Sequence, residues 1–545
     1  LIVASCVPIW RTISALKREF QRDKILQNSV ANETEIGSIF IEFFGRETAS
    51  CSLLSEKLLR FNENARIFPP NKHGVPSIEP YPIVGNMGGM VFRTTSLSDV
   101  IGKLYNLNPD AKYVGFYEFN TPIVIIRDID LIKSVCVKHF DNFHDHRPFI
   151  DKEMDKILAG MLFCLTGEKW RDDRNMLSPA FTSSKIKTMF ALMSDRAVYF
   201  AKFLSNLPEK ERVLEVKSVF TRYTTDVIAS CVFGIEVDSI NDPKNPIYVK
   251  SRKVLNFAGL IQSIKILMAR NMSGLSRMLG ISVMSKSIST FFENLISTAV
   301  KHRDENGIYK PDMLQLLMET RNKKQYGKGF SIEDITTHAF AFFFGGSDTV
   351  ASQLSFAIYH LATNPDVYER LQNEIDETLE RTQGQLSYDA VMGMEYLDAV
   401  INETMRIHPI GAMLDRMSGN DFELPPALPG GKPFTVKAGS NIWIPVHAIH
   451  LDPNYYEDPH KFDPERFLVD GKRIMASGTY LPFGVGQRMC IGNRFALVEM
   501  KVLLCHLLAR CDVKACSKTS VPLELAKEDN CSLLLSSRNN IIIRC

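Results

Sequence analysis

The sequence lacks an excess of either charge. It has 64 lysine and arginine residues against 62 aspartate and glutamate residues, a formal net charge of +2, and the two kinds are mixed along the chain. Proteins that bind nucleic acid carry clustered positive charge, so we expect no nucleic-acid partner. Internal repeats and low-complexity segments are also absent, which excludes repeat and fibrous architectures. With 45% hydrophobic and 23% charged residues, the composition is typical of a globular protein.

A long apolar run at the start of the sequence is missing as well. Leu1–Trp10 is apolar, but Arg11 follows directly, and a helix that crosses a bilayer needs ~20 apolar residues. We therefore interpret residues 1–67 as an atypical N-terminal segment, either the remnant of a membrane anchor or a mis-joined stretch. Five prolines between positions 68 and 82 then lead the chain into its main body, which we place at residues 68–545.

Cysteine pairs at metal-ligand spacing are absent too. The eleven cysteines are scattered and odd in number, which favours reduced thiols in a reducing compartment. Cys505, Cys511 and Cys516 lie close together in the sequence, without a Cys-x-x-Cys pair. Ordinary core or surface thiols are the favoured interpretation, and a zinc-binding interaction protein is an alternative that metal analysis would test.

Strand patterns occur only towards the two ends of the main body. Residues 112–118 and 122–127 flank a turn at Asn120–Thr121 and predict a β-hairpin. Strand-like runs return at residues 441–446 and 541–543, whereas most of the chain between has apolar residues at helical spacing. The sequence therefore predicts one large, mainly α-helical domain with small peripheral β-sheets.

One predicted helix is unusually long. Ser331 and Asp334 resemble a capping box, apolar residues follow at close spacing, and Asn364–Pro365 ends the segment. A helix of about 30 residues is far longer than the usual ~11 to 12. Its apolar character on every side predicts that it is buried.

The middle of this helix reads Gly-Gly-Ser-Asp-Thr at residues 345–349. A glycine inside a helix costs about 1 kcal/mol relative to alanine, so Gly345 and Gly346 form a local weak point. The Thr349 hydroxyl is placed to donate to the Gly345 carbonyl or to a solvent molecule in an opened turn. Two interpretations stay open: a widened turn that holds a small ligand, with Asp348 and Thr349 to deliver protons, or a glycine-lined helix crossing.

A glycine-rich loop surrounds Cys490. Residues 482–496 read PFGVGQRMCIGNRFA, and an apolar helix is predicted from Arg494 to Leu508. Glycines let a backbone approach a flat group closely. A helix N-terminus and the cation of Arg488 both favour a thiolate. A buried structural cysteine is the simpler alternative, but it leaves the regular spacing of the flanking residues unexplained.

The same loop resembles the haem-binding signature of the cytochrome P-450 superfamily, Phe-x-x-Gly-x-Arg-x-Cys-x-Gly. Phe483, Gly486, Arg488, Cys490 and Gly492 match every position. The resemblance implies the α-rich prism of that superfamily, with haem b between the long oxygen-groove helix and the helix after the cysteine loop. It also implies that Cys490 is the axial ligand of the haem iron, where a thiolate favours cleavage of the O–O bond.

Further positions match the superfamily pattern. Gly345, Gly346, Asp348 and Thr349 resemble the oxygen-groove motif, which implies haem contact for the glycines and proton delivery for the other two, although Val350 stands where Thr or Ser is usual. Trp170, Arg174, Arg416 and Arg488 fall at positions that hold the haem propionates. Glu403, Arg406 and Arg466 match a triad that braces the haem side of the core, a structural role.

The resemblance implies a monooxygenase that inserts one atom of dioxygen into a lipophilic small molecule. It implies electrons from NADPH through a cytochrome reductase, with cytochrome b5 as a second donor, on the cytoplasmic face of the endoplasmic reticulum. Residues 221–228 and 311–319 resemble insect microsomal detoxification members. Residues 254–284 are either an amphipathic surface that lies in the membrane or two core-facing helices. The alternatives are a reductase-independent enzyme that rearranges peroxides and a non-catalytic haem or lipid carrier.

Overall fold

The computed structural model describes residues 74–81, 84–91, 94–255, 260–271, 273–321, 329–524 and 542–544. The segment at residues 1–67 therefore lies outside the described residues. Among the α-helices of the described residues, none combines the length and the apolar character needed to cross a bilayer. The α-helices are α4 Gly88–Val91, α5 Leu97–Tyr105, α6 Ile129–Lys133, α7 Lys156–Gly160, α8 Gly167–Leu177, α9 Ser183–Ser205, α10 Val216–Ile228, α11 Pro246–Leu255, α12 Leu260–Asn271, α13 Ser273–Met278, α14 Lys286–Asn306, α15 Met313–Thr320, α16 Ile332–Thr363, α17 Pro365–Arg381, α18 Tyr388–Met392, α19 Glu395–Ile407, α20 Val446–His450, α21 Glu465–Val469, α22 Gly471–Ser477 and α23 Asn493–Leu508.

Three small sheets accompany these helices. One has the strand order β1-β2-β7-β4, in which β2 and β7 are parallel and the other pairs antiparallel. The second has the order β3-β9-β8, and the third pairs β5 with β6. The strands are β1 Tyr113–Glu118, β2 Thr121–Ile126, β3 Val213–Glu215, β4 Leu414–Met417, β5 Phe422–Leu424, β6 Phe434–Val436, β7 Asn441–Ile444, β8 Lys514–Ala515 and β9 Ile542–Arg544. The predicted fold class, mainly α with small peripheral sheets, is confirmed.

The predicted hairpin is present, with one difference in its turn. Glu118 pairs with Thr121, so the turn is Phe119–Asn120 and not Asn120–Thr121. Phe119 takes up the left-handed backbone region, with φ of 55°. The turn prediction was wrong by one residue because a phenylalanine gives no sequence signal for that conformation.

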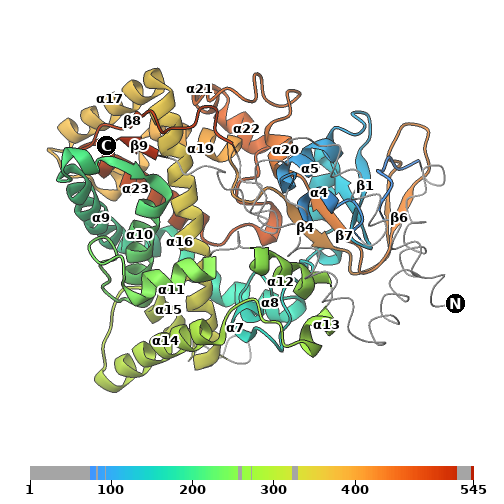
Figure 1. Ribbon diagram of the computed structural model, residues 1–545, viewed down its shortest axis with the longest axis horizontal. Helices are drawn as coiled ribbons and strands as arrows, with labels where there is room; N and C mark the ends of the chain where they lie inside the picture. Colours follow the sequence, from blue (N-terminus) through green and yellow to red (C-terminus); the bar gives the residue numbers. More distant parts are fainter. Residues whose placement is uncertain are drawn as a thin grey trace, which may run out of the picture.

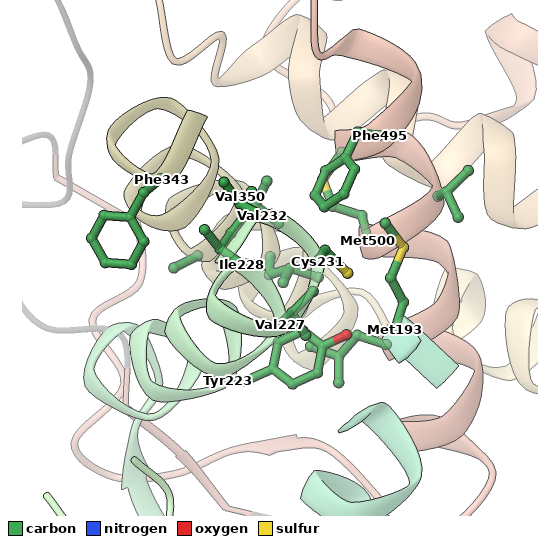
Figure 2. Close-up of a cluster of buried hydrophobic side chains, with 14 of the residues drawn as sticks. Met193, Tyr223, Val227, Ile228, Cys231, Val232, Phe343, Val350, Phe495 and Met500 are labelled. Atoms are coloured by element: carbon green, nitrogen blue, oxygen red, sulfur yellow. The ribbon is translucent and has the colours of Figure 1, made fainter. Parts of the chain in front are cut away.

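The long helix α16 organises the molecule. Figure 1 shows it running through the middle, with α9, α10, α17 and α23 on one side and the four-stranded sheet on the other. Ser331 caps it, and the capping box with Asp334 is formed as predicted. Figure 2 shows why it stays in place: apolar side chains of α10, α16 and α23, among them Ile228, Val350 and Phe495, meet in one buried cluster.

Candidate functional site

The loop before α23 holds Cys490 in a tight backbone turn. The Cys490 N–H donates to the Phe483 carbonyl at 2.8 Å, which folds the loop back on itself. Gly484 and Gly486 have φ of 81° and 74°, a region that favours glycine. A Cβ on Gly486 would also overlap the carbonyl oxygen of Cys136. These glycines are therefore required for the shape of the loop.

The Cys490 side chain is enclosed by protein and yet exposed. Burial raises the pKa of the Cys490 thiol, whereas the Gly492 backbone N–H and the charge of Arg174 lower that pKa. At the same time the side chain is solvent-accessible, so it faces an opening inside the fold. Arg488 was the cation expected to favour the thiolate, but the guanidinium that acts on the thiol is that of Arg174, which also donates to the Met489 carbonyl at 2.9 Å.

Arg488 faces Trp170 and the segment before α7 instead. Its guanidinium carbon lies 3.9 Å from the centre of the Trp170 ring, within the range of a cation–π contact. Nε donates to the His144 carbonyl at 2.6 Å, and Nη2 donates to the Asp145 carboxylate at 3.1 Å. Burial, as the largest cause, lowers the pKa of Arg488 to about 10. The Arg488 guanidinium is thus held in a partly buried position beside the cysteine loop.

Arg416 approaches the same loop from strand β4. It is 1% exposed, and its Nη2 donates to the Val485 carbonyl at 3.2 Å. Among the described residues, Nε of Arg416 and Nη1 of Arg488 are buried without a hydrogen-bond partner. Buried charged donors normally have acceptors, so two free donors beside an exposed thiol fit an anionic group such as the propionates of a haem. The residues present therefore fit the cofactor that the sequence implies.

The two glycines of α16 have different surroundings. A Cβ on Gly346 would be 2.6 Å from the Ile228 side chain, whereas one on Gly345 would meet nothing within 4 Å. Gly346 therefore allows α10 and α16 to pack closely, which is the helix crossing considered above. Gly345 is exposed in the middle of a mostly buried helix. The Thr349 hydroxyl donates to the Gly345 carbonyl at 2.6 Å, and α16 is α-helical throughout. The widened turn is therefore not present.

Asp348 is paired with a neighbouring helix. Its carboxylate lies 2.7 Å from Nζ of Lys217 on α10, and the same ammonium donates to the Asp348 carbonyl at 2.9 Å and to the Ser352 hydroxyl. Thr349 donates to Gly345. The two side chains that the sequence grouped together therefore have different partners, and the lysine was not predicted.

Glu403, Arg406 and Arg466 come together as a buried ionic cluster. Glu403 lies 2.7 Å from Nε of Arg406 and 3.1 Å from Nε of Arg466. The side chains of Glu403 and Arg406 are fully buried. Arg406 also donates to the His450 carbonyl at 2.7 Å. His450 interacts with the Arg406 carbonyl through Nδ1 and accepts from the Leu481 N–H at 2.8 Å. The cluster is thus linked through one histidine to the start of the cysteine loop.

A second network joins α12 to the strand that carries Arg416. Glu118 is 4% exposed in its side chain and lies 2.7 Å from Nε of Arg270 on α12 and 2.6 Å from Nη1 of Arg147. The Arg147 N–H donates to the Asp415 carboxylate at 2.9 Å. Asp415, next to Arg416, has its pKa held well below the usual range by His146 and Arg270, against the effect of its burial.

Sequence reasoning missed Lys217, Asp145, His450 and Glu118. Each contacts a partner that is far away in the sequence; Lys217 and Asp348, for example, are 131 residues apart. None of the four belongs to a recognisable motif. The three neighbouring cysteines have separate partners: Cys505 faces the Met394 sulfur, Cys511 faces the Ala201 carbonyl, and Cys516 faces the Thr519 hydroxyl. Within the described residues, no group of three metal-binding side chains occurs.

Comparisons with known proteins agree with this geometry. The cytochrome P450 family model matches residues 75–544. The chain is 39% identical to cytochrome P450 9e2 of Blattella germanica, over 84% of this chain and 90% of that protein. It is 36% identical to the probable cytochrome P450 9f2 of Drosophila melanogaster, over 83% and 90%, and 35% identical to cytochrome P450 3A18 of Rattus norvegicus, over 84% and 90%. The expected likeness to insect members is confirmed, and the chain belongs to the cytochrome P450 family of haem-dependent monooxygenases.

Proposed function

We propose that the protein oxidises a lipophilic small molecule in the opening between Cys490 and α16, with haem b as the cofactor and residues 68–545 as the catalytic domain. The observation that carries the proposal is the exposed Cys490 thiol beside the unpartnered donors of Arg416 and Arg488. Cys490 would bind the haem iron, and Trp170, Arg174, Arg416 and Arg488 would hold the propionates. Phe483 and Gly345 would shape the two walls, and Gly346 keeps α10 and α16 in close contact. When bound, the haem supplies the oxygen-activating chemistry.

Thr349 and Asp348 supply protons in this proposal. The Thr349 hydroxyl is partly exposed next to Gly345, so it is able to exchange its hydrogen bond to the Gly345 carbonyl for one to a solvent molecule. The Asp348 carboxylate is one residue away in the sequence, and its ion pair with Lys217 fixes its position. A positioned hydroxyl and carboxylate are groups that general acid catalysis uses. Glu403, Arg406 and Arg466 keep the cysteine loop in place through His450.

The electrons come from NADPH through a cytochrome reductase, with cytochrome b5 as a second donor. We place the protein on the cytoplasmic face of the endoplasmic reticulum membrane. Met278 and Leu279, at the end of α13, are 70% and 48% exposed, and large apolar side chains at a surface mark contacts with membranes or partners. The surface around α13 is therefore proposed to touch the bilayer.

The carbon monoxide difference spectrum tests the ligand. Cys490→Ser is expected to lose the Soret shift of the reduced carbon monoxide complex, while Cys516→Ser, a cysteine outside the site, keeps it. An unchanged spectrum in Cys490→Ser would contradict the proposal. Turnover of a panel of terpenoids, fatty acids and pesticides with NADPH and reductase, compared with turnover of an organic hydroperoxide alone, separates the monooxygenase from the peroxide-rearranging alternative.

Peroxide release tests the proton path. Thr349→Ala is expected to keep the haem but to release more hydrogen peroxide for each NADPH consumed, because the hydroxyl beside Gly345 is lost. Thr349→Ser restores the hydroxyl and is the matched control. A fully coupled Thr349→Ala enzyme would show that this residue does not deliver protons.

A further inference from the structure

A hollow of about 650 Å³ lies along one face of α14, next to the turn that follows α10. It contains none of the residues assigned to the haem. Its walls are apolar and come from Phe291, Leu295 and Ala299 on α14 and from Phe233, Ile235 and Ile308 around it. Hollows of ~300 to 1,000 Å³ with mainly apolar walls are the usual size of small-molecule sites.

A buried ion pair forms the rigid end of this hollow. Arg303 and Asp312 are almost completely buried and joined by two hydrogen bonds of 2.5 and 2.7 Å. Arg303 also donates to the Phe233 carbonyl at 3.1 Å. Gly234, with φ of 63°, lies so close to both that a Cβ there would overlap them. Bidentate pairing of this kind fixes geometry, so this end of the hollow is rigid.

The opening of the hollow carries positive charge at both ends. At one end the exposed Lys310 donates one ammonium hydrogen to the Gly234 carbonyl at 2.8 Å, and two donors remain because an ammonium has three. The exposed His302 lies beside it along the wall. At the other end, Nζ of Lys250 lies 4.8 Å from the centre of the Phe291 ring.

The length of the apolar strip limits the ligand. Phe291 and His302 are eleven positions apart on one helix, which corresponds to about 16 Å at a rise of 1.5 Å per residue. We propose that this hollow binds an amphipathic anion of the fatty-acid class, with its chain along Phe291, Leu295 and Ala299 and its carboxylate at Lys310. An apolar strip that ends at a lysine matches an acyl chain that ends in a carboxylate, since burial of the chain and pairing of the charge then occur together.

Binding to the holoenzyme tests the proposal once the haem site is blocked by a saturating azole. A dansyl-labelled undecanoic acid, followed by fluorescence and displaced by dodecanoate, is expected to occupy one further site per chain. Dodecanol, which lacks the charge, is expected to compete at least about tenfold more weakly, a factor that corresponds to one charge-assisted contact. Loss of all binding after azole addition would overturn the proposal, and equal competition by the alcohol would overturn the anionic class.

Two variants locate the site. Lys310→Glu, an exposed change that leaves the core intact, is expected to weaken binding at least about tenfold by the same reasoning. Ala299→Trp fills the hollow and is expected to abolish binding. Lys286→Glu, exposed at the opposite end of α14, is the matched control and binds as the parent does. An unchanged carbon monoxide spectrum verifies folding. Parent-like binding by Lys310→Glu, or an equal loss in Lys286→Glu, would refute the assigned place.

Discussion

Replacing Glu499 with methionine is expected to stabilise the protein. Glu499 lies on α23, is fully buried, and has no hydrogen-bond partner for either carboxyl oxygen among the described residues. Its carboxylate interacts electrostatically with Tyr223 and Cys231, which belong to the buried cluster that Figure 2 shows. Burial raises the pKa of Glu499 well above its usual 4.5, because no positive partner compensates for the charged form.

The raised pKa determines how stability changes with pH. The folded protein keeps a proton that the unfolded chain releases, so this stabilisation is complete below about pH 4.5 and is lost as the pH rises towards the folded pKa. Over that interval the free energy of unfolding falls by about 1.4 kcal/mol per pH unit. A buried polar group without a partner costs a further ~1 to 3 kcal/mol. Methionine has a similar length and no such group, so Glu499→Met removes both costs.

The assay is thermal unfolding of the holoenzyme at a fixed scan rate between about pH 6 and pH 9, because large proteins often unfold irreversibly. Glu499→Met is expected to raise the midpoint throughout, and most at high pH. Glu499→Gln removes the titration but keeps a buried polar group, so it is expected to flatten the pH dependence without the gain at low pH. A less stable methionine variant that retains the parent's pH dependence would show that the carboxyl is well compensated and would refute the reasoning.

Three further predictions rest on buried charge. Arg270→Ala leaves Glu118 with one arginine and is expected to lower the free energy of unfolding by about 2 kcal/mol. Because α12 is then held less firmly, azole association and release, measured by stopped flow, are expected to become faster; unchanged rates would contradict this. Glu403→Gln leaves Arg406 buried without its counter-charge, which costs about 3 to 5 kcal/mol, so little protein with haem is expected; normal haem content would refute it. The pKa of His450 is lowered to about 3, chiefly by burial, so its stabilisation, present above about pH 6.5, is lost as the pH falls towards 3; His450→Gln is expected to flatten the acid loss of the carbon monoxide spectrum.

Local sequence signals were sufficient wherever one short segment determines its own geometry. The capping box of Ser331, the hairpin and the hydrogen bond from Thr349 to Gly345 all join residues within a few positions of each other. In such cases backbone preferences and side-chain reach limit the alternatives. The cysteine loop belongs to the same group in part, since the Cys490 N–H bonds to the Phe483 carbonyl and Gly484 and Gly486 adopt the left-handed backbone region.

Contacts between distant segments could not be predicted from the sequence. Whether the Asp348 carboxylate turns to Thr349 or to Lys217 depends on how α10 crosses α16, and that crossing depends on Gly346 and Ile228. The cation acting on the Cys490 thiol was misassigned for the same reason, because Arg488 is drawn towards Trp170 and Asp145 by groups far away in the chain. Spacing within one motif specifies residue types but not the direction of a long side chain.

The arginines around the site differ in how firmly they are held, and this difference has a consequence for cofactor binding. Arg488 has an acidic partner in Asp145 and a ring contact with Trp170. Among the described residues, the hydrogen bonds of Arg174 and Arg416 go only to backbone carbonyls, those of Met489, Asp415 and Val485. A carbonyl does not balance a full charge, so these two gain most from an anionic ligand. The residues around the Cys490 loop therefore present positive charge that a dianionic group would neutralise.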